Sequence, residues 1–342
     1  MENPFDVVTG GAGFIGSHLC RALLKQGRRV RVVDNFSTGR SENLAELLEQ
    51  YPDQCEVHRQ DIRQLEKLQA AFEGAANVYH QAALTSVQQS VEDPLECNSV
   101  NVEGTLKVLL AARDAGVDKV IFATSTAVYG NSEILPKHEE MTPEPVSPYA
   151  VTKYMGEVYG RVFSEIYQLP TLGLRYFNVF GPNQDPNSEY AAVIPRFITR
   201  ALAGNDPIIF GDGEQSRDFI FVEDVVAANL KAAQSDVHGK ILNVASGRQC
   251  TLNQLVELLS GIVGRKLTPE YQSARDAEVR HSVADVSLAC ELVGFESETS
   301  LAEGLRRTVR WYQEQRTWWE RVRSGAYQEY YDRMYGHRLE DA

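Results

Sequence analysis

Two side chains near the middle of the chain have the types and spacing of a proton-transfer pair. Tyr149 and Lys153 lie four residues apart in the run SPYAVTK, so a helix would place them one turn apart on one face. Ser147 and Pro148 suit the N-cap and first position of that helix. A phenol has an ordinary pKa of about 10, and a nearby ammonium and the positive end of a helix both favour its ionised form. Tyr149 is therefore a candidate base, although such a pair also occurs on ordinary helix surfaces.

Two hydroxyl side chains, Ser125 and Thr126, follow the apolar run 120–124, which predicts a strand. Ligands of parallel sheets gather at the carboxyl ends of the strands. There the two hydroxyl groups could hold a reacting hydroxyl and the carbonyl that develops from it. The alternative is that they only cap the end of the strand.

A glycine-rich turn stands near the start of the chain. Gly10, Gly13 and Gly16 follow a short apolar run and open a helical pattern, so the backbone can approach a pyrophosphate at the helix N-terminus. Asp34 ends the second predicted strand, where a carboxylate accepts the hydroxyls of an adenosine ribose. This order predicts NAD, although Arg40 keeps NADP open. The alternative is that the glycines only turn the chain and Asp34 only caps a strand.

Asp61 ends the third predicted strand and is a second candidate for the adenine side of the cofactor. It could equally cap the helix that follows. The positive charge of an oxidised nicotinamide near Tyr149 would further favour the phenolate.

The elements that must position these residues alternate along the first half of the chain. Short β-branched runs predict strands at 7–9, 30–33, 55–58, 78–80, 120–124 and 171–176, with helical patterns between them. This rhythm predicts an α/β fold with a doubly wound parallel (Rossmann) sheet. A strand over 241–245 and a helix over 252–263 would continue it. The irregular stretches after 181–182 predict a smaller, discontinuous α/β substrate lobe.

The predicted domain boundaries follow from these patterns. Residues 1–180 and about 225–265 form the NAD-binding domain, about 181–224 and 266–315 form the smaller lobe, and 316–342 form a tail rich in aromatic residues. Aromatic side chains favour buried or contact surfaces, so we expect a packing or interface role for the tail.

The composition excludes several classes of protein. The 342 residues carry a net charge of −13, which argues against a nucleic-acid partner. The chain has no run of about 20 apolar residues and no signal-peptide pattern at its start, so we expect a cytoplasmic protein without a membrane partner. Five widely spaced cysteines predict neither disulfide bonds nor a metal site.

Further motifs occur in a fixed order along the chain. They are Thr9–Gly16, Asp34–Ser37, Asp61–Ile62, His80–Ala83, Asn101 with Gly104–Thr105, Ser125 before Val128–Gly130, Tyr149 with Lys153, Arg175–Asn178 and Arg217–Asp218. Over nearly all of 7–312 the chain resembles the NAD-dependent sugar-nucleotide epimerase/dehydratase family of extended short-chain dehydrogenases/reductases.

The resemblance implies further contacts with NAD, and Tyr149 and Lys153 are two of them. The others are Phe14, Ile15, Asn35, Ser37, Thr38, Gly39, Ile62, Gln81, Ala82, Ala83, Thr85, Asn101, Thr124, Tyr176 and Val179.

The resemblance also implies a UDP-sugar as substrate. Arg217 and Arg275 would clamp the diphosphate, Asn178 would hold the sugar end or its linking phosphate, and Glu278 would hold the ribose. Surface salt bridges are the alternative for the two arginines. The full set of implied substrate contacts is Ser86, Ser125, Thr126, Tyr149, Asn178, Gln184, Ala192, Val193, Arg217, Arg275, Glu278 and Ser282.

An absence indicates which reaction follows the oxidation at sugar C4. Dehydratases of this family resemble Thr-Asp-Glu-Val-Tyr-Gly, and decarboxylases also place a Glu before Val-Tyr-Gly, whereas this chain has Thr126 and Ala127 there. Without those carboxylates the ketone can only be reduced again, which predicts a UDP-hexose 4-epimerase. A decarboxylase or dehydratase with its acids elsewhere is an alternative, and an NAD-binding sensor is a non-enzymatic one.

The segments Arg280–Ser282 and Tyr190–Pro195 resemble the subgroup that acts on N-acetylated sugars. A bulky Tyr resembles the gate at the Ser282 position in epimerases restricted to glucose and galactose. We therefore expect interconversion of UDP-N-acetylglucosamine and UDP-N-acetylgalactosamine, or of their uronates, with UDP-glucose as the alternative. The family resemblance also suggests a homodimer, in which helices near 102–115 and 149–167 form a four-helix bundle.

Overall fold

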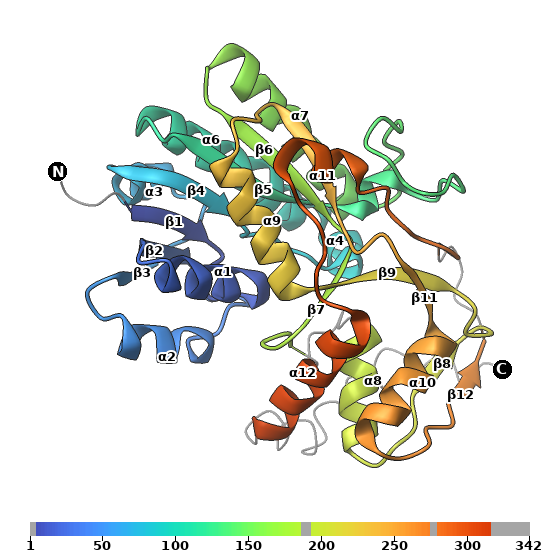
Figure 1. The fold of residues 1–342 in the computed structure, drawn as a ribbon. Helices are drawn as coiled ribbons and strands as arrows, with labels where there is room; N and C mark the ends of the chain where they lie inside the picture. The colour runs from blue at the N-terminus through green and yellow to red at the C-terminus, as the bar shows by residue number, and fades with distance from the viewer. Residues whose placement is uncertain (1–4, 186–192, 274–278, 316–342) are drawn as a thin grey trace.

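Seven parallel strands form the central sheet of the computed structural model, which describes residues 5–185, 193–273 and 279–315. Their order across the sheet is β10-β6-β5-β4-β1-β2-β3 (Figure 1). The strands are β1 (Phe5–Thr9), β2 (Arg29–Asp34), β3 (Cys55–Arg59), β4 (Ala75–His80), β5 (Lys119–Ser125), β6 (Thr171–Tyr176) and β10 (Lys240–Val244). The predicted strands and the doubly wound fold are confirmed.

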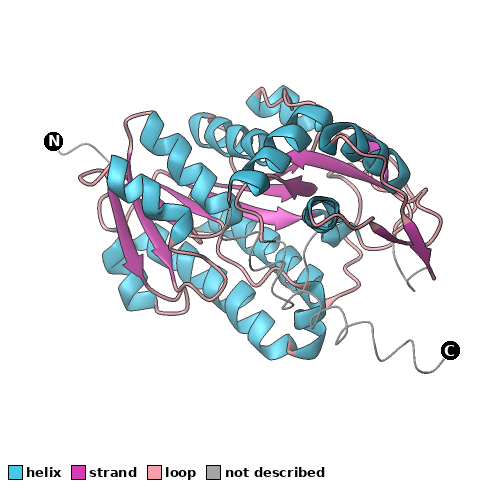
Figure 2. Ribbon diagram, turned by 90° about the horizontal axis from the view of Figure 1, so that it is seen from below, coloured by secondary structure: helices cyan, strands magenta, loops and turns pink. Residues whose placement is uncertain are grey.

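Helices cover both faces of this sheet because successive strand residues point to opposite sides. Val8 packs in a core with α1 (Phe14–Lys25), α2 (Glu42–Gln50), α9 (Val222–Gln234) and α11 (Ser287–Val293). Its neighbour Val7 packs on the other side with α3 (Leu65–Phe72), α6 (Gly104–Asp114) and α7 (Pro148–Ile166). Figure 2 shows this layering from below.

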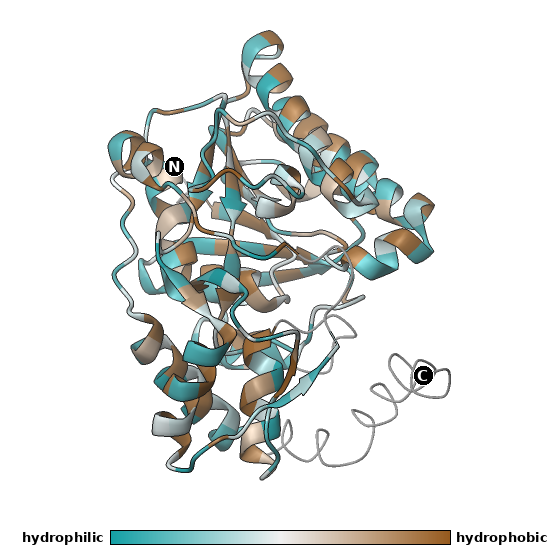
Figure 3. Ribbon diagram, turned by 90° about the vertical axis from the view of Figure 1, so that its right-hand side faces the viewer, coloured by the Kyte–Doolittle hydropathy of each residue, from teal (hydrophilic) through white to brown (hydrophobic). Residues whose placement is uncertain are grey.

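A smaller lobe has its own core beside the sheet, seen at the lower right in Figure 1. Its strands pair in the orders β11-β9-β7 and β12-β8. Figure 3 shows hydrophobic and hydrophilic residues alternating along the helices of both lobes, as expected where one side of a helix is buried. The elements are β7 (Asn178–Phe180), α8 (Val193–Leu202), β8 (Ile208–Phe210), β9 (Ser216–Phe221), β11 (Gln249–Thr251), α10 (Leu252–Val263), β12 (Glu270–Gln272) and α12 (Leu301–Glu314).

The chain crosses between the two cores more often than we expected. The predicted helix 252–263 is present as α10, but Leu255 and Leu259 pack with α8 and α12 in the smaller core rather than on the sheet. Conversely, Ala289 of α11 packs in the core of the large sheet, whereas the sequence predicts that 266–315 belongs to the smaller lobe. The lobes are thus interleaved beyond the predicted boundaries.

Within the described ranges, no helix is both long and apolar enough to cross a membrane. The same residues contain no group of three or more His, Cys, Asp or Glu side chains that could hold a metal ion. The predicted aromatic tail, 316–342, lies outside the described residues.

Candidate active site

The sequence around Tyr149 folds into the helix start that its residue types favour. Helix α7 has Ser147 as N-cap, whose Oγ accepts a hydrogen bond from the Ala150 N–H at 3.2 Å, and Pro148 at its first position. Tyr149 and Lys153 then lie one turn apart, with the Lys153 Nζ 5.9 Å from the centroid of the Tyr149 ring. The pair points inward rather than lying on the surface, since Tyr149 is buried and the Lys153 Nζ donates to the Ala123 carbonyl oxygen at 3.1 Å.

Strand β5 brings Ser125 to this pair. Ser125 lies close enough to Tyr149 to lower the pKa of its phenol, and the Ser125 Oγ accepts a hydrogen bond from the Ala127 N–H at 3.1 Å. Ser125 therefore caps the 3-10 turn η2 (Thr126–Tyr129) and also lies near the candidate base. The capping alternative is confirmed for Ser125, its site role stays a prediction, and Thr126 follows as the first residue of η2.

The pKa shifts of the pair have a common cause. Burial raises the pKa of Tyr149, and the nearby Ser125 hydroxyl only partly opposes this. Burial also lowers the pKa of Lys153 to about 8, although the nearby Glu157 carboxylate acts in the opposite direction. The protein's own groups thus leave Tyr149 as a phenol at neutral pH, and our expectation that the neighbouring ammonium favours the phenolate does not prevail over burial.

The glycine-rich turn joins β1 to α1, and its backbone is packed so closely that Gly10 and Gly16 have no room for a side chain. Gly10 has φ +69°, and a Cβ on Gly16 would lie 2.1 Å from the Gly10 carbonyl oxygen. Helix α1 begins after Gly13 with no side-chain cap and no acidic residue in its first turn. Its first N–H groups and its positive dipole end suit a pyrophosphate, so these residues fit the dinucleotide cofactor that the sequence predicts.

Asp34 lies directly beside this turn at the end of β2. Its two carboxylate oxygens accept hydrogen bonds from the Ala12 N–H at 2.9 Å and from the Phe36 N–H at 2.8 Å. Each oxygen retains a lone pair for a ribose hydroxyl. A Cβ on Gly39 would lie 2.8 Å from an Asp34 oxygen, so this glycine permits the close approach of its loop. Arg40 of the same loop forms an ion pair with Asp185.

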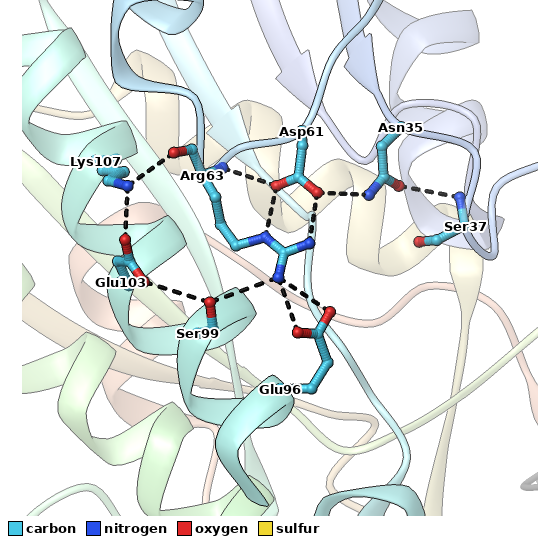
Figure 4. A network of polar contacts seen from close by, with 8 residues as sticks. All are labelled: Asn35, Ser37, Asp61, Arg63, Glu96, Ser99, Glu103 and Lys107. Atoms are coloured by element: carbon cyan, nitrogen blue, oxygen red, sulfur yellow. Dashed lines mark hydrogen bonds and ion pairs between the residues drawn. The ribbon is translucent and has the colours of Figure 1, made fainter. Parts of the chain in front are cut away.

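Asp61 lies in a polar network that the sequence did not reveal (Figure 4). The Arg63 guanidinium contacts both Asp61 oxygens, at 3.0 and 2.8 Å, and lowers the pKa of Asp61 to about 2. Arg63 also reaches Glu96 on α5 (Pro94–Asn98) at 2.9 Å, while the Asn35 amide donates to Asp61 at 3.1 Å. Asp61 is not the N-cap of α3, a position held by Gln64.

Asn101 organises the segment after β4. Its side-chain amide accepts from the Leu84 N–H at 2.8 Å and donates to the Leu84 carbonyl oxygen at 2.9 Å. It also donates to Thr152 of α7 at 3.0 Å, from its place on the π-helix η1 (Ser99–Glu103). Asn101 thereby ties the predicted cofactor-binding segment 81–85 to the helix that carries Tyr149.

Other predicted NAD contacts lie on strand ends and loops around the same site. Gln81 accepts a hydrogen bond from the Tyr176 hydroxyl at 3.1 Å, and its own N–H donates to the Thr9 carbonyl oxygen at 3.0 Å. The remaining positions are Phe14 and Ile15 in the first turn of α1, Ser37 and Thr38 in the loop after β2, Ile62 after β3, Ala82, Ala83 and Thr85 after β4, Thr124 on β5 and Val179 on β7.

The predicted substrate contacts divide into two groups. Ser86 is the buried N-cap of α4 (Val87–Glu92), next to the cofactor segment. In the smaller lobe, Arg217 donates to the Ser216 carbonyl oxygen at 2.9 Å, and the Ser282 N–H donates to the same oxygen at 3.2 Å. Asn178 lies on β7, Gln184 follows that strand, and Val193 begins α8; Ala192, Arg275 and Glu278 lie outside the described residues.

Asp218 is a supporting residue whose role sequence reasoning missed. It is fully buried and accepts hydrogen bonds from the backbone N–H groups of Ser246, Gly247 and Ala284 at 2.8 to 3.1 Å. It therefore fixes β9, with its neighbour Arg217, to the loop after β10 and to the segment that follows Ser282. Its adjacency to Arg217 in the sequence was the available signal.

Known proteins of similar sequence and structure act on nucleotide sugars. The model of the NAD dependent epimerase/dehydratase family matches residues 7–245. A UDP-glucose 4-epimerase of Mycolicibacterium smegmatis is 39% identical over 90% of this chain and 97% of its own length. A UDP-N-acetyl-alpha-D-glucosaminuronate decarboxylase of Bacillus cytotoxicus is 33% identical over 90% of this chain and 97% of its own length.

A solved structure agrees closely with this one. The UDP-N-acetylglucosamine 4-epimerase from Methanobrevibacter ruminantium M1, in complex with UDP-N-acetylmuramic acid, superposes with a TM-score of 0.86. It is 41% identical in sequence, and the alignment covers 92% of this chain and all of that one.

Proposed function

Because the chain belongs to the NAD-dependent epimerase/dehydratase family, we propose that it is a UDP-hexose 4-epimerase which inverts sugar C4 by transient oxidation. The observation that carries the proposal is the placement of the buried Tyr149 ring 5.9 Å from the Lys153 Nζ, at the carboxyl edge of the sheet where β5 ends in Ser125 and the glycine-rich turn follows β1. The proposed residues therefore lie where the fold places ligands.

In this mechanism Tyr149 takes the proton of the C4 hydroxyl and later returns a proton to the C4 oxygen when the ketone is reduced. Bound NAD supplies the two-electron oxidising chemistry and, in its oxidised form, a positive charge. That charge adds to the Lys153 ammonium and the α7 dipole, and the three together oppose the burial that raises the pKa of Tyr149. Ser125 and Thr126 hold the hydroxyl and the developing carbonyl oxygen.

The residue before Val128 supports epimerisation over elimination or decarboxylation. Ala127 has no carboxylate to protonate a leaving oxygen or to remove the C5 proton. The ketone is then reduced again, and reduction from the other face inverts C4. The relationship to a decarboxylase makes that reaction the second candidate, and the product masses separate the two because epimers have equal mass.

The smaller lobe would hold the UDP part of the substrate. Arg217 is proposed to clamp the diphosphate, because it lies on β9 of the smaller lobe and its planar guanidinium suits paired phosphoryl oxygens. Its Nη1 donates to the Ser216 carbonyl oxygen at 2.9 Å. Asn178 would hold the sugar end or its linking phosphate. The proposals that Arg275 joins the clamp, that Glu278 holds the ribose and that Ala192 contacts the sugar rest on the sequence.

We further propose a preference for an N-acetylated hexose. Ser282 is small and 7% exposed, and its backbone is fixed on the same carbonyl oxygen as the Arg217 side chain. A small residue near the sugar leaves room for an acetamido group. The similarity to a UDP-N-acetylglucosamine 4-epimerase supports this preference, while the UDP-glucose epimerase relative supports the alternative.

A panel of UDP-sugars tests both the reaction and the preference. We expect proton NMR to show conversion of UDP-N-acetylglucosamine to its C4 epimer, with UDP-glucose turned over at least about tenfold more slowly, as a few kcal/mol of lost contacts would give. In Ser282→Tyr the phenol fills the acetamido space, so kcat/KM for the acetylated sugar should fall about 100-fold while that for UDP-glucose changes little. A wild-type preference for UDP-glucose would remove the inference about Ser282, and Ser287→Thr, at the start of α11, serves as a control.

A homodimer remains part of the proposal. Val91, Leu95 and Val151 are 63%, 82% and 45% exposed on α4, α5 and α7, which contact one another. An apolar surface of this kind is typical of a protein interface. Light scattering should therefore give about twice the mass of one chain. A cytoplasmic location likewise stays a prediction.

A further inference from the structure

A buried ion pair lies one helical turn beyond Lys153. Glu157 of α7 and Arg175 of β6 are each 4% exposed, and the guanidinium contacts both carboxylate oxygens, from Nε at 2.8 Å and from Nη2 at 2.6 Å. The desolvation of two buried charges is costly, so such a pair is weak evidence for stability alone. Its position next to the proposed proton-transfer pair suggests another use.

The pair connects the elements that carry the proposed catalytic residues. The Thr124 hydroxyl donates to the Glu157 Oε1 at 2.7 Å, and Thr124 immediately precedes Ser125 on β5. The Arg175 guanidinium lies 4.7 Å from the centroid of the Tyr129 ring, and the Tyr129 hydroxyl donates to Asn243 of β10 at 2.7 Å. Glu157 therefore fixes the end of β5 against α7, where Ser125 meets Tyr149.

Few charged groups face the Lys153 ammonium. Tyr149 and Glu157 face it from α7, Cys97 from α5 and His80 from β4, while the Ala123 carbonyl oxygen of β5 accepts its hydrogen bond. Burial lowers the pKa of His80 to about 3 and raises the pKa of Cys97, so both are neutral at physiological pH. Glu157 is the carboxylate of this set, and it is paired with Arg175.

We propose that Glu157 is a positioning residue for the C4 oxidation, which it serves by holding Thr124 and Ser125 beside α7 and by keeping Lys153 charged next to Tyr149. This inference rests on the proposed function and deepens it, since Glu157 acts through the same proton transfer. Arg175 holds both oxygens of the Glu157 carboxylate through two charge-assisted hydrogen bonds.

The test compares Glu157→Gln, which removes the charge, with Glu157→Asp, which keeps it and shortens the side chain. In Glu157→Gln the Lys153 ammonium loses its proton at lower pH. The alkaline limb, the fall of kcat at high pH in a plot of kcat against pH, should therefore move down by about one pH unit. At pH 9 kcat then falls about tenfold with little change in KM. In Glu157→Asp the limb should stay at the wild-type pH even if the melting temperature falls. Glu165→Gln, at an exposed position of α7, is the matched control and should leave the limb unchanged.

A spectroscopic titration provides a readout that needs no turnover. The absorbance of tyrosinate is followed against pH in the NAD-bound protein, and the same curve for Tyr149→Phe is subtracted to isolate Tyr149. Glu157→Gln should shift this ionisation to higher pH, because a neutral Lys153 no longer favours the phenolate. If the wild-type protein shows no epimerisation, the proposed function fails, whereas the titration still decides the role of Glu157.

The proposal would be overturned if folded Glu157→Gln kept both the wild-type alkaline limb and the wild-type Tyr149 titration and only had a lower melting temperature. The Glu157–Arg175 pair would then have a structural role alone. If that variant does not fold, Arg175→Gln replaces it. The carboxylate and its bond from Thr124 then remain without the neighbouring positive charge, so the limb should move to higher pH. A limb that stays or moves down in Arg175→Gln would equally contradict the role of Glu157.

Discussion

Substitution of Tyr149 by Phe should lower the epimerase kcat by about a thousandfold or more while NAD remains bound. The hydroxyl is the group that exchanges a proton with the sugar, and general acid–base catalysis by a side chain contributes about 10² to 10⁴ in rate. The ring itself is retained, so the packing of the buried Tyr149 side chain against its surroundings changes little. The measurement is kcat by NMR, together with the NAD content of the purified protein.

Tyr167→Phe is the matched control, because Tyr167 ends the same helix, is 46% exposed and keeps its ring against Arg113 after the change. It should retain wild-type turnover. Wild-type activity in Tyr149→Phe would remove the phenol from the mechanism and would require another base near Ser125.

Substitution of Gly16 by Ala should abolish NAD binding. The added Cβ would lie 2.1 Å from the Gly10 carbonyl oxygen and 2.8 Å from the Gly11 Cα, and both are backbone atoms that cannot rotate away. The turn must therefore move as a whole, which displaces the N–H groups that face the pyrophosphate. We expect a cost in folding free energy of about 1–3 kcal/mol, as for other overpacked sites, and little bound cofactor after purification.

Gly261→Ala is the control for this change, since it lies in α10 and its Cβ would meet no atom within 4 Å. Alanine has a higher helix propensity than glycine, so this variant should be as stable as the wild type or more stable by up to about 1 kcal/mol. NAD released by acid from both variants is quantified by absorbance. Full NAD occupancy in Gly16→Ala would contradict the placement of the cofactor at this turn.

The sequence predicts the central sheet well because its strands are short β-branched runs separated by helical patterns. The sequence could not predict against which core α10 packs, for a physical reason. Leu255 and Leu259 form an apolar stripe that would suit either core, and only the tertiary structure directs it to α8 and α12. The packing of α11 in the core of the large sheet could not be predicted either, because Ala289 is a small residue in a short helix and gives a weak hydrophobic pattern.

The candidate site was predictable where neighbouring residues share one local element. Ser147, Pro148, Tyr149 and Lys153 belong to one helix start, and their spacing gives their arrangement. Glu157 extends the stripe of Tyr149 and Lys153 by one more turn, which was a usable signal, but its partner Arg175 comes from a different strand. The network of Asp61, Arg63 and Glu96 likewise joins residues of separate elements.

The electrostatic balance at Tyr149 could not be predicted from spacing alone. The sequence places a lysine near the phenol, but burial acts on both groups, raising the pKa of Tyr149 and lowering that of Lys153 to about 8. The extent of burial depends on the packing of β5, α5 and α7 around them. The charge that favours the phenolate must therefore come in part from the cofactor.

In the proposed reaction the hydrogen on sugar C4 leaves and returns without exchanging with water. The most direct measurement follows UDP-N-acetylglucosamine carrying deuterium at C4, incubated with the NAD-bound protein in ordinary water. We predict that the C4 epimer forms with its deuterium still at C4 and with the mass of the substrate. Loss of the deuterium to solvent, or a product lighter by water or carbon dioxide, would contradict the account.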